Sequence, residues 1–375
     1  MLLLVFGVSP RIWFYSQASD SFKLSQESQD RPLIGIFSMP LPVKLRQKLL
    51  VKIEESSERV EGLSGEEDLK ELSFFPSSYA KWVQDQGADV LPIDYKTSTE
   101  ELTVLMSKLH GILLTGGATE LYSREEVQVY RKSVRRTQKQ PSTFSRKIGV
   151  VLEQAKKINT QRTFPIWGTC LGFEAMVLNE VNYSVEMKRV NNLNSVAPIK
   201  LVSRRSYTHS STSQLEQTSP NVFNYLSTED VQQVEQHSLA YFNHLNGFTV
   251  ADFAQNEVTS EHFEVLATTL TVHRHEQREI VAAIRHKKFP FFGVQFHPEK
   301  AKFESGVPLR GDPEAQKVAD LLGRFFVDQA RESSQQSQVA VHEVLSHFEE
   351  YEFFKAENVG QFDQLELMRK RRRII

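Results

Sequence analysis

Residues 164–178 read FPIWGTCLGFEAMVL, and this stretch decides the fold. Four apolar residues come first, the glycine-flanked pentapeptide GTCLG (residues 168–172) follows, and an apolar run of good helix formers comes next. An apolar strand that passes through a glycine turn into a helix is typical of a parallel sheet covered by helices. Cys170 then lies on the turn itself, in the arrangement of a nucleophile elbow, where a sharp strand-to-helix turn exposes the side chain.

Apolar segments of the same kind recur on both sides of this stretch. Each is apolar throughout rather than at alternate positions, which favours strands buried on both faces. These predicted strands are residues 33–38, 90–93, 111–114, 279–284 and 291–296, with helices predicted near 79–83 and 315–330. We therefore predict an α/β fold with a mostly parallel central sheet. The polar stretches 41–72 and 122–163 are interpreted as helix and loop, and 203–220 as a surface loop or insertion.

The composition excludes several classes of protein. The 375 residues are 40% hydrophobic and 25% charged with a formal net charge of −2, which excludes disorder of the whole chain. The chain has no overall basic charge, so its composition does not indicate a nucleic-acid partner. The apolar run at residues 2–8 is far shorter than the roughly 20 residues that a membrane-spanning helix needs, so no transmembrane segment is predicted.

The two ends of the chain differ in composition from the centre. Residues 1–18 resemble a short secretory signal, which favours a lysosomal, vacuolar or extracellular protein; a frayed or wrongly assigned N-terminus is the alternative. Residues 31–331 form the predicted catalytic domain. Residues 332–375 are interpreted as a tail with an amphipathic helix near 341–351 and a basic cluster, 369–373. That cluster is either a solvated end or a site for an anionic partner.

Cys170 is the only cysteine, which excludes an intramolecular disulfide and a cysteine-based zinc or iron–sulfur site. At a helix N-terminus the unpaired N–H groups and the dipole favour the thiolate, so we expect a lowered thiol pKa. The alternative is a buried, inert cysteine. A catalytic thiol needs a base and an orienting group. His297 follows a predicted strand at the same edge of the sheet, and Glu299 lies two residues further on.

An oxyanion hole is the third requirement of such a site. The backbone N–H of Leu171, next to the thiol, is one expected donor. The N–H groups of Gly116 and Gly117, in the turn after the strand at 111–114, are the others. The alternative role of these glycines is simply to form a turn.

These motifs together resemble the class I glutamine amidotransferase fold, whose members use a Cys-His-Glu triad. Longer strings are similar to the gamma-glutamyl hydrolase family over roughly residues 31–331. They are PIWGTCLGFE (165–174), GILLTGG (111–117), QFHPEKA (295–301) and SYAKW (78–82). Family members usually carry several cysteines, whereas this chain has one, and the tail beyond Arg331 has no recognised counterpart.

The resemblance implies hydrolysis of γ-linked glutamates in folate and antifolate polyglutamates, without a metal or an organic cofactor. It assigns Cys170 as nucleophile, His297 as general base and then acid, and Glu299 as the group that orients His297. Substrate contacts are implied for His237, Tyr79 and Glu174, each of which could instead be a surface, capping or packing residue. A homodimer is also implied.

Two other kinds of protein remain open at this point. One is a glutaminase that passes ammonia to a synthetase. A hydrolase of small γ-glutamyl amines is a close variant of the folate polyglutamate hydrolase. The other is a non-catalytic binding protein on the same fold. The presence of Cys170, His297 and Glu299 together favours an enzyme.

Overall fold

The computed structural model describes residues 31–55, 66–131, 134–202, 220–336 and 342–371. The predicted signal (residues 1–18) and nearly all of the predicted insertion at 203–220 lie outside the described residues.

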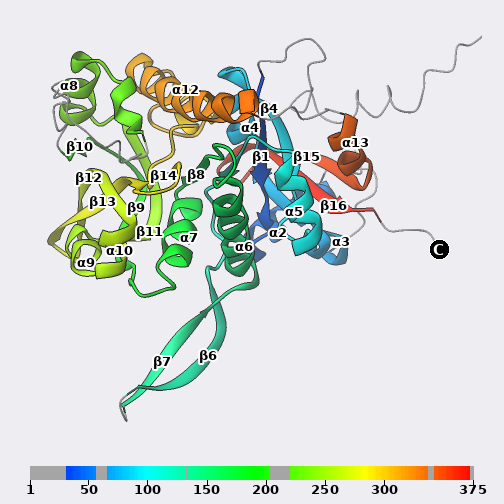
Figure 1. The fold of residues 1–375 in the computed structure, drawn as a ribbon, viewed down its shortest axis with the longest axis horizontal. Helices are drawn as coiled ribbons and strands as arrows, with labels where there is room; N and C mark the ends of the chain where they lie inside the picture. The colour runs from blue at the N-terminus through cyan, green and yellow to red at the C-terminus, as the bar shows by residue number, and fades with distance from the viewer. Residues whose placement is uncertain (1–30, 56–65, 132–133, 203–219, 337–341, 372–375) are drawn as a thin grey trace, which may run out of the picture.

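An eight-stranded sheet forms the centre of the molecule (Figure 1). Five neighbouring strands are parallel, and all are fully buried, as continuous apolar segments predict. In spatial order they are β4 (Asp89–Ile93), β1 (Leu33–Phe37), β5 (Gly111–Leu114), β8 (Ile166–Thr169) and β14 (Phe291–Val294). The predicted α/β class with a mostly parallel sheet is confirmed.

Helices cover both faces of this sheet and make it a three-layer structure. One apolar core joins the sheet to α5 (Thr99–Ser107), α6 (Thr143–Ile158) and α7 (Leu171–Glu180). The other core joins the opposite face to α4 (Ser77–Asp85) and α12 (Pro313–Gln336), and includes the tilted ring pair Trp82–Trp167. The carboxyl ends of the parallel strands therefore open between two helical layers.

The far edge of the sheet is antiparallel. Its strands are β13 (Glu276–His286), β12 (Phe263–His273) and the short β10 (Lys200–Leu201). Arg274 and His275, which join β12 to β13, both have positive φ, as a two-residue hairpin turn requires. The strand predicted at 279–284 is thus half of a hairpin whose turn lacks the usual asparagine or glycine.

An inserted unit lies beyond this edge. It pairs β9 (Lys188–Ala197) with β11 (Ala240–Gly247) in an antiparallel ribbon that packs on β12. Its helical elements are η2 (Val222–Tyr225), α8 (Thr228–Gln236), α9 (Val250–Gln255) and α10 (Glu257–His262). The ribbon brings β11 next to the segment that follows β14, since Tyr241 accepts a hydrogen bond from the His297 N–H at 2.8 Å.

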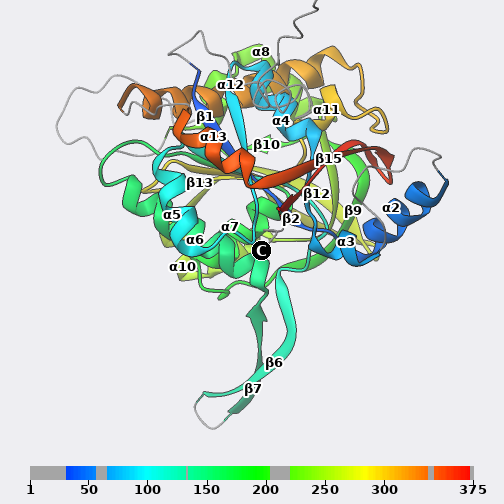
Figure 2. The same ribbon diagram turned by 90° about the vertical axis from the view of Figure 1, so that its right-hand side faces the viewer.

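The interpretation of residues 122–163 as helix and loop is wrong for their first half. Strands β6 (Tyr122–Arg131) and β7 (Val134–Pro141) form a two-stranded ribbon that projects from the body (Figure 2). Val127 and Val129 are two positions apart, the spacing of a strand, and they pair with Gln138 and Arg136. The many charged residues around them obscure this alternation of apolar and polar residues in the sequence.

The helix predicted near 341–351 is present at His342–Glu349, but the interpretation of residues 332–375 as a tail is wrong. Helix α12 continues through residue 331 to Gln336, and α13 (His342–Glu349) precedes β15 (Tyr351–Val359) and β16 (Phe362–Lys370). Strand β16 pairs with β3 (Ser73–Pro76) in a sheet of order β15-β16-β3-β2, where β2 is Met39–Pro40. Apolar side chains of this segment belong to the main core, beside α2 (Val43–Glu55) and α3 (Glu66–Glu71).

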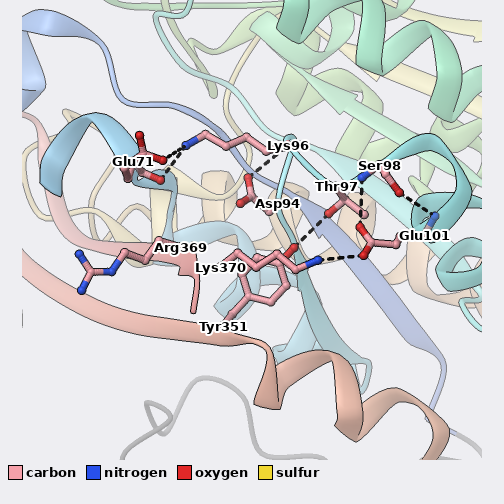
Figure 3. A pocket seen from close by; sticks show the side chains of 9 residues that line it. All are labelled: Glu71, Asp94, Lys96, Thr97, Ser98, Glu101, Tyr351, Arg369 and Lys370. Carbon is pink, nitrogen blue, oxygen red and sulfur yellow. Dashed lines mark hydrogen bonds and ion pairs between the residues drawn. The ribbon is translucent and has the colours of Figure 1, made fainter. Parts of the chain in front are cut away.

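The start of the basic cluster is paired rather than free. Arg369 contacts Asp68 and Glu352, and Lys370 contacts Glu101. They line a polar cavity of about 440 Å³ between β16 and the segment that follows β4 (Figure 3). Among the described residues, no helix is long and apolar enough to cross a membrane.

Candidate active site

Cys170 occupies a strained turn between β8 and α7. Its φ of +50° and ψ of −107° are rare for a residue with a side chain, and it is the N-cap of α7. The Cys170 N–H donates to the carbonyl of Val294 on β14 at 2.8 Å, which fixes the turn to the neighbouring strand. Such strain persists only where surrounding structure imposes it, and it clusters at functional sites. The predicted sharp strand-to-helix turn at Cys170 is therefore present, and the nucleophilic role of the thiol stays a prediction.

The flanking glycines allow close packing rather than unusual dihedral angles. A Cβ on Gly172 would lie 2.2 Å from the carbonyl oxygen of Leu114 on β5. A Cβ on Gly168 would lie 2.8 to 2.9 Å from the backbone of the first turn of α7. The helix can approach the sheet this closely only without side chains at these positions.

His297 and Glu299 form the expected pair. The Nδ1 of His297 lies 2.8 Å from a carboxylate oxygen of Glu299, and both residues are buried, with 5% and 0% of their surface exposed. Since a carboxylate only accepts, Nδ1 carries the proton and Nε2 is left as the basic nitrogen. This arrangement is compatible with the predicted role of His297 as a base, which stays a prediction.

The position of Gly116 shows that the three parts of the site converge. A Cβ built on Gly116 would lie 2.8 Å from Cε1 of His297, 3.1 Å from Cβ of Cys170 and 2.5 Å from the hydroxyl of Tyr79. The elbow, the histidine and the turn after β5 therefore meet around one glycine. Any side chain at this position would fill the reaction centre.

Burial dominates the electrostatics of the thiol and the imidazole. It raises the pKa of the Cys170 thiol well above its usual range, aided by the charge of Glu174, although Lys300 and the Leu171 N–H oppose the rise. Burial also lowers the pKa of His297, against the opposing effect of Glu299. The expected lowering of the thiol pKa is wrong for the resting site, because desolvation outweighs the helix N-terminus. Both shifts favour the uncharged forms of the thiol and the imidazole.

Two of the three expected oxyanion donors remain available. The Gly116 N–H donates to the Tyr79 hydroxyl at 2.8 Å, so it is already occupied. The Leu171 N–H faces the Cys170 sulfur, where it would meet a carbonyl under attack. Gly117 has no room for a side chain, since its Cβ would lie 2.2 Å from the sulfur of Met39. The Leu171 N–H is thus the donor that a contact with the sulfur supports, and the Gly117 N–H stays a prediction.

The three predicted substrate contacts lie in different surroundings. The Tyr79 hydroxyl is 3.2 Å from Nδ1 of His297, inside the site. Glu174 is buried one turn after the elbow and accepts a hydrogen bond from Gln295 at 2.9 Å; burial raises its pKa to about 8. His237 is exposed at the end of α8, four residues before Tyr241, and makes no side-chain contact with the triad among the described residues.

The sequence interpretation missed Lys300 and Tyr241. Lys300 follows Glu299 directly and is only 2% exposed, yet no carboxylate of the described residues lies within ion-pair distance of it. Its ammonium lies 5.6 Å from the centre of the Tyr241 ring, and that ring lies 6.1 Å from the His297 ring. The adjacency of a lysine to the triad was a usable signal for the first residue; nothing local indicated the second.

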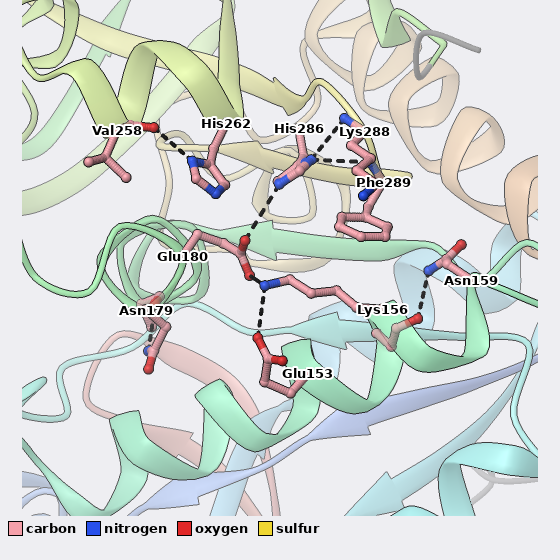
Figure 4. A network of polar contacts seen from close by, with 12 residues as sticks. Glu153, Lys156, Asn159, Asn179, Glu180, Val258, His262, His286, Lys288 and Phe289 are labelled. Atoms are coloured by element: carbon pink, nitrogen blue, oxygen red, sulfur yellow. Dashed lines mark hydrogen bonds and ion pairs between the residues drawn. The ribbon is translucent and has the colours of Figure 1, made fainter. Parts of the chain in front are cut away.

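A second polar cluster, shown in Figure 4, lies at the end of α7 opposite to Cys170. Glu180, His262 and His286 could together offer three metal ligands. However, Nδ1 of His286 accepts two backbone N–H groups of the next turn, so its Nε2 carries the proton and faces Glu180 at 3.5 Å. Lys156 also lies 2.8 Å from Glu180. The donor set fits an ion-pair network better than a metal.

The fold and this site are those of the class I glutamine amidotransferase family. The family model described as "Glutamine amidotransferase class-I" matches residues 77–308, and the chain belongs to this family.

Curated relatives within it carry a more specific name. The chain is 27% identical to a gamma-glutamyl hydrolase of Bos taurus over 78% of this chain and 81% of that protein. It is 23% identical to gamma-glutamyl hydrolase B of Dictyostelium discoideum over 86% and 79%, respectively. It is 25% identical to gamma-glutamyl hydrolase 1 of Arabidopsis thaliana over 70% and 66%.

Proposed function

We propose that this protein is a cysteine-type γ-glutamyl hydrolase that removes γ-linked glutamates from folate poly-γ-glutamates. One observation carries the proposal: Cys170 on its strained elbow and the buried His297–Glu299 pair converge at Gly116. The names of relatives from an animal, an amoeba and a plant support the γ-glutamyl specificity.

The proposed reaction begins with transfer of the Cys170 proton to Nε2 of His297 as the sulfur attacks the γ-amide carbonyl. The N–H groups of Leu171 and Gly117 stabilise the oxyanion. His297 then gives its proton to the departing amine, which leaves a thioester on Cys170. Finally His297 removes a proton from water, and hydroxide attack on the thioester releases the new γ-carboxylate and restores the thiol. Glu299 stabilises the imidazolium in both halves.

Lys300 supports an anionic substrate. A buried ammonium without a carboxylate partner is costly unless another anion or aromatic faces stabilise it. Poly-γ-glutamate carries one free carboxylate per residue, so its chain would supply the missing charge. Glu174, neutral below a pH of about 8, would donate a hydrogen bond to the substrate instead of repelling its carboxylates.

A glutaminase is the second candidate, because the family model describes glutamine amidotransferases. The curated relatives named above favour a hydrolase, and the two activities differ in product. Free glutamine would release ammonia in one case, and pteroylpolyglutamate would be shortened in the other.

The test is mass spectrometry of products after incubation of purified protein with pteroylpentaglutamate at acidic and neutral pH. Cys170→Ala is the matched control. Shortened folates with free glutamate or glutamate peptides, from wild type alone, are expected. Ammonia from glutamine without folate cleavage would establish the amidotransferase reaction, and inactivity in both assays would favour a binding protein.

We further propose that the protein acts in a lysosome, a vacuole or outside the cell, and that it is a homodimer. The resemblance of residues 1–18 to a secretory signal supports the compartment. N-terminal sequencing of the mature protein and its mass by light scattering would test the two statements.

A further inference from the structure

The turn of the β15–β16 hairpin lies against the active-site elements. Val359 and Phe362 are paired across it, and Gly360, the first residue of the turn, has positive φ. Phe362 is nearly buried, whereas Gln361 beside it is exposed. We call residues 361–363 the hairpin tip.

The hairpin tip is bonded to the segment that follows the triad. That segment is α11 (Lys300–Phe303) and the two residues after it. The Asp363 carboxylate accepts hydrogen bonds from the backbone N–H and the hydroxyl of Ser305, at 2.8 and 2.7 Å. The Asp363 N–H donates to Glu304 at 2.8 Å. Three hydrogen bonds therefore fix the tip to the short helix that begins with Lys300.

The hairpin also reaches the two other elements that hold His297. Gln361 accepts a hydrogen bond at 2.7 Å from Asn243 of β11, the strand whose Tyr241 carbonyl receives the His297 N–H. Glu366 accepts one at 2.8 Å from Ser77, the first residue of α4, which carries Tyr79. A segment far from the triad in sequence thus contacts three elements near the imidazole: the segment that begins with α11, strand β11 and helix α4.

Phe362 faces Lys300. The ammonium lies 5.2 Å from the centre of the Phe362 ring and 5.6 Å from that of Tyr241, so it is held between two aromatic faces. Among the described residues no carboxylate neutralises it at ion-pair distance. Aromatic faces attract a cation without neutralising its charge, so the field of this ammonium still reaches the thiol and the imidazole.

We propose that the hairpin tip is a positioning element of the active site, in which Phe362 and Tyr241 hold the Lys300 ammonium toward the reaction centre. It deepens the proposed function and rests on it, since the same ammonium would bind a carboxylate of the γ-glutamyl chain. Phe362 touches neither substrate nor thiol and acts through Lys300. A purely structural hairpin would instead contribute stability alone.

The test compares Phe362→Leu with Phe362→Tyr. Leucine keeps an apolar side chain but removes the aromatic face, whereas tyrosine keeps the aromatic face. The matched control is Phe354→Leu on β15 of the same hairpin. The guanidinium of Arg369 lies 5.3 Å from the centre of the Phe354 ring, so this ring makes a cation–π contact away from the triad. Phe362→Leu should raise KM about 3- to 10-fold, the range of one partly buried cation–π contact, with a smaller change in kcat. Phe362→Tyr and Phe354→Leu should keep the wild-type KM.

A second readout needs no substrate. Because Cys170 is the only cysteine, its alkylation by iodoacetamide as a function of pH reports the thiolate at one site. Lys300→Met and Phe362→Leu should both shift the alkylation midpoint to higher pH, and Phe362→Tyr should restore it. These shifts are expected even if no folate is cleaved, which separates this inference from the proposed function.

Other outcomes would overturn the inference. A lowered melting temperature in Phe362→Leu, with KM and the alkylation midpoint unchanged, would leave the tip a structural element only. If Phe362→Leu does not fold, Gln361→Ala serves as the second variant, because its side chain is exposed and only the tie to β11 is lost. An unchanged KM and midpoint there would contradict the inference equally.

Discussion

The hydroxyl of Tyr79 accepts a hydrogen bond from the backbone N–H of Gly116 at 2.8 Å and lies 3.2 Å from Nδ1 of His297. One phenol therefore joins the turn after β5 to the base. Tyr79 is fully buried, and burial raises its pKa well above its usual range, so it stays a neutral phenol throughout the working pH range.

Tyr79→Phe should lower the free energy of unfolding by about 1–3 kcal/mol, because the buried Gly116 N–H loses its acceptor. We expect kcat to fall roughly tenfold, the equivalent of one hydrogen bond, with little change in KM. Denaturant unfolding and steady-state kinetics measure the two effects. An increase in kcat would mean that the tyrosine occupies a donor that the oxyanion uses.

Gly116→Ala should abolish turnover, since its Cβ would lie 2.5 Å from the Tyr79 hydroxyl and 2.8 Å from the His297 ring. Gly306→Ala is the matched control, because a Cβ there meets nothing within 4 Å. Its kinetics should equal those of wild type. Retained activity in Gly116→Ala would contradict the convergence of the site at this glycine.

Cys170→Ala and Cys170→Gly should both lack hydrolase activity but differ in stability. A side chain at φ +50°, ψ −107° costs of order 1–3 kcal/mol, which glycine avoids at these angles. The glycine variant should therefore be at least as stable as the alanine variant, against the usual penalty for glycine. Thermal melting of the pair decides, and a clearly less stable glycine variant would argue against strain at the elbow.

The acid limb of kcat/KM should have its midpoint below the usual imidazole pKa of 6.5, because burial lowers the pKa of His297. The base must be neutral, so activity rises as pH increases through that value. Glu299 opposes the effect of burial, so Glu299→Ala should move the midpoint lower still, with a smaller loss of rate than Cys170→Ala. A pH–rate profile of each protein measures this, and a midpoint above 6.5 would contradict it.

Glu174 should make the protein less stable as pH rises from about 4.5 to about 8. Its pKa is near 8 in the fold against 4.5 for a solvated carboxyl, so the folded state holds the extra proton in this window. The stabilisation is complete below 4.5 and is lost toward 8, by an amount on the order of a few kcal/mol. Chemical unfolding at several pH values should show this slope in wild type and a flatter one in Glu174→Gln. If the unfolding free energy of the two proteins changes equally with pH, a group other than Glu174 is responsible for the slope.

The sharp turn at Cys170 and the contact between His297 and Glu299 could be predicted because each rests on a short stretch of sequence. Cys170 stands between an apolar strand and a helix, and His297 and Glu299 are two positions apart at a strand end. The expected lowering of the thiol pKa failed because burial, which outweighs the helix N-terminus here, depends on packing from several elements.

The contacts of the C-terminal hairpin could not be predicted in this way. Phe362 lies 62 positions after Lys300, and no local pattern relates the two. The charged residues around Arg369 are typical of a solvated end, whereas the structure pairs them with distant acids. Hydrophobic periodicity describes one element at a time, so it does not indicate which remote strand completes a sheet.

The pairing of β16 with β3 also orders events during biosynthesis. Ser77 and its partner Glu366 are 289 positions apart, so a ribosome adds Glu366 long after Ser77. Until then the edge of β3 is open and the Lys300 ammonium lacks one of its aromatic faces. The nascent polypeptide therefore carries its thiol and its base well before the surroundings of the site are complete. Full affinity for an anionic substrate should therefore arise only after the β15–β16 hairpin has been made and has folded onto this site.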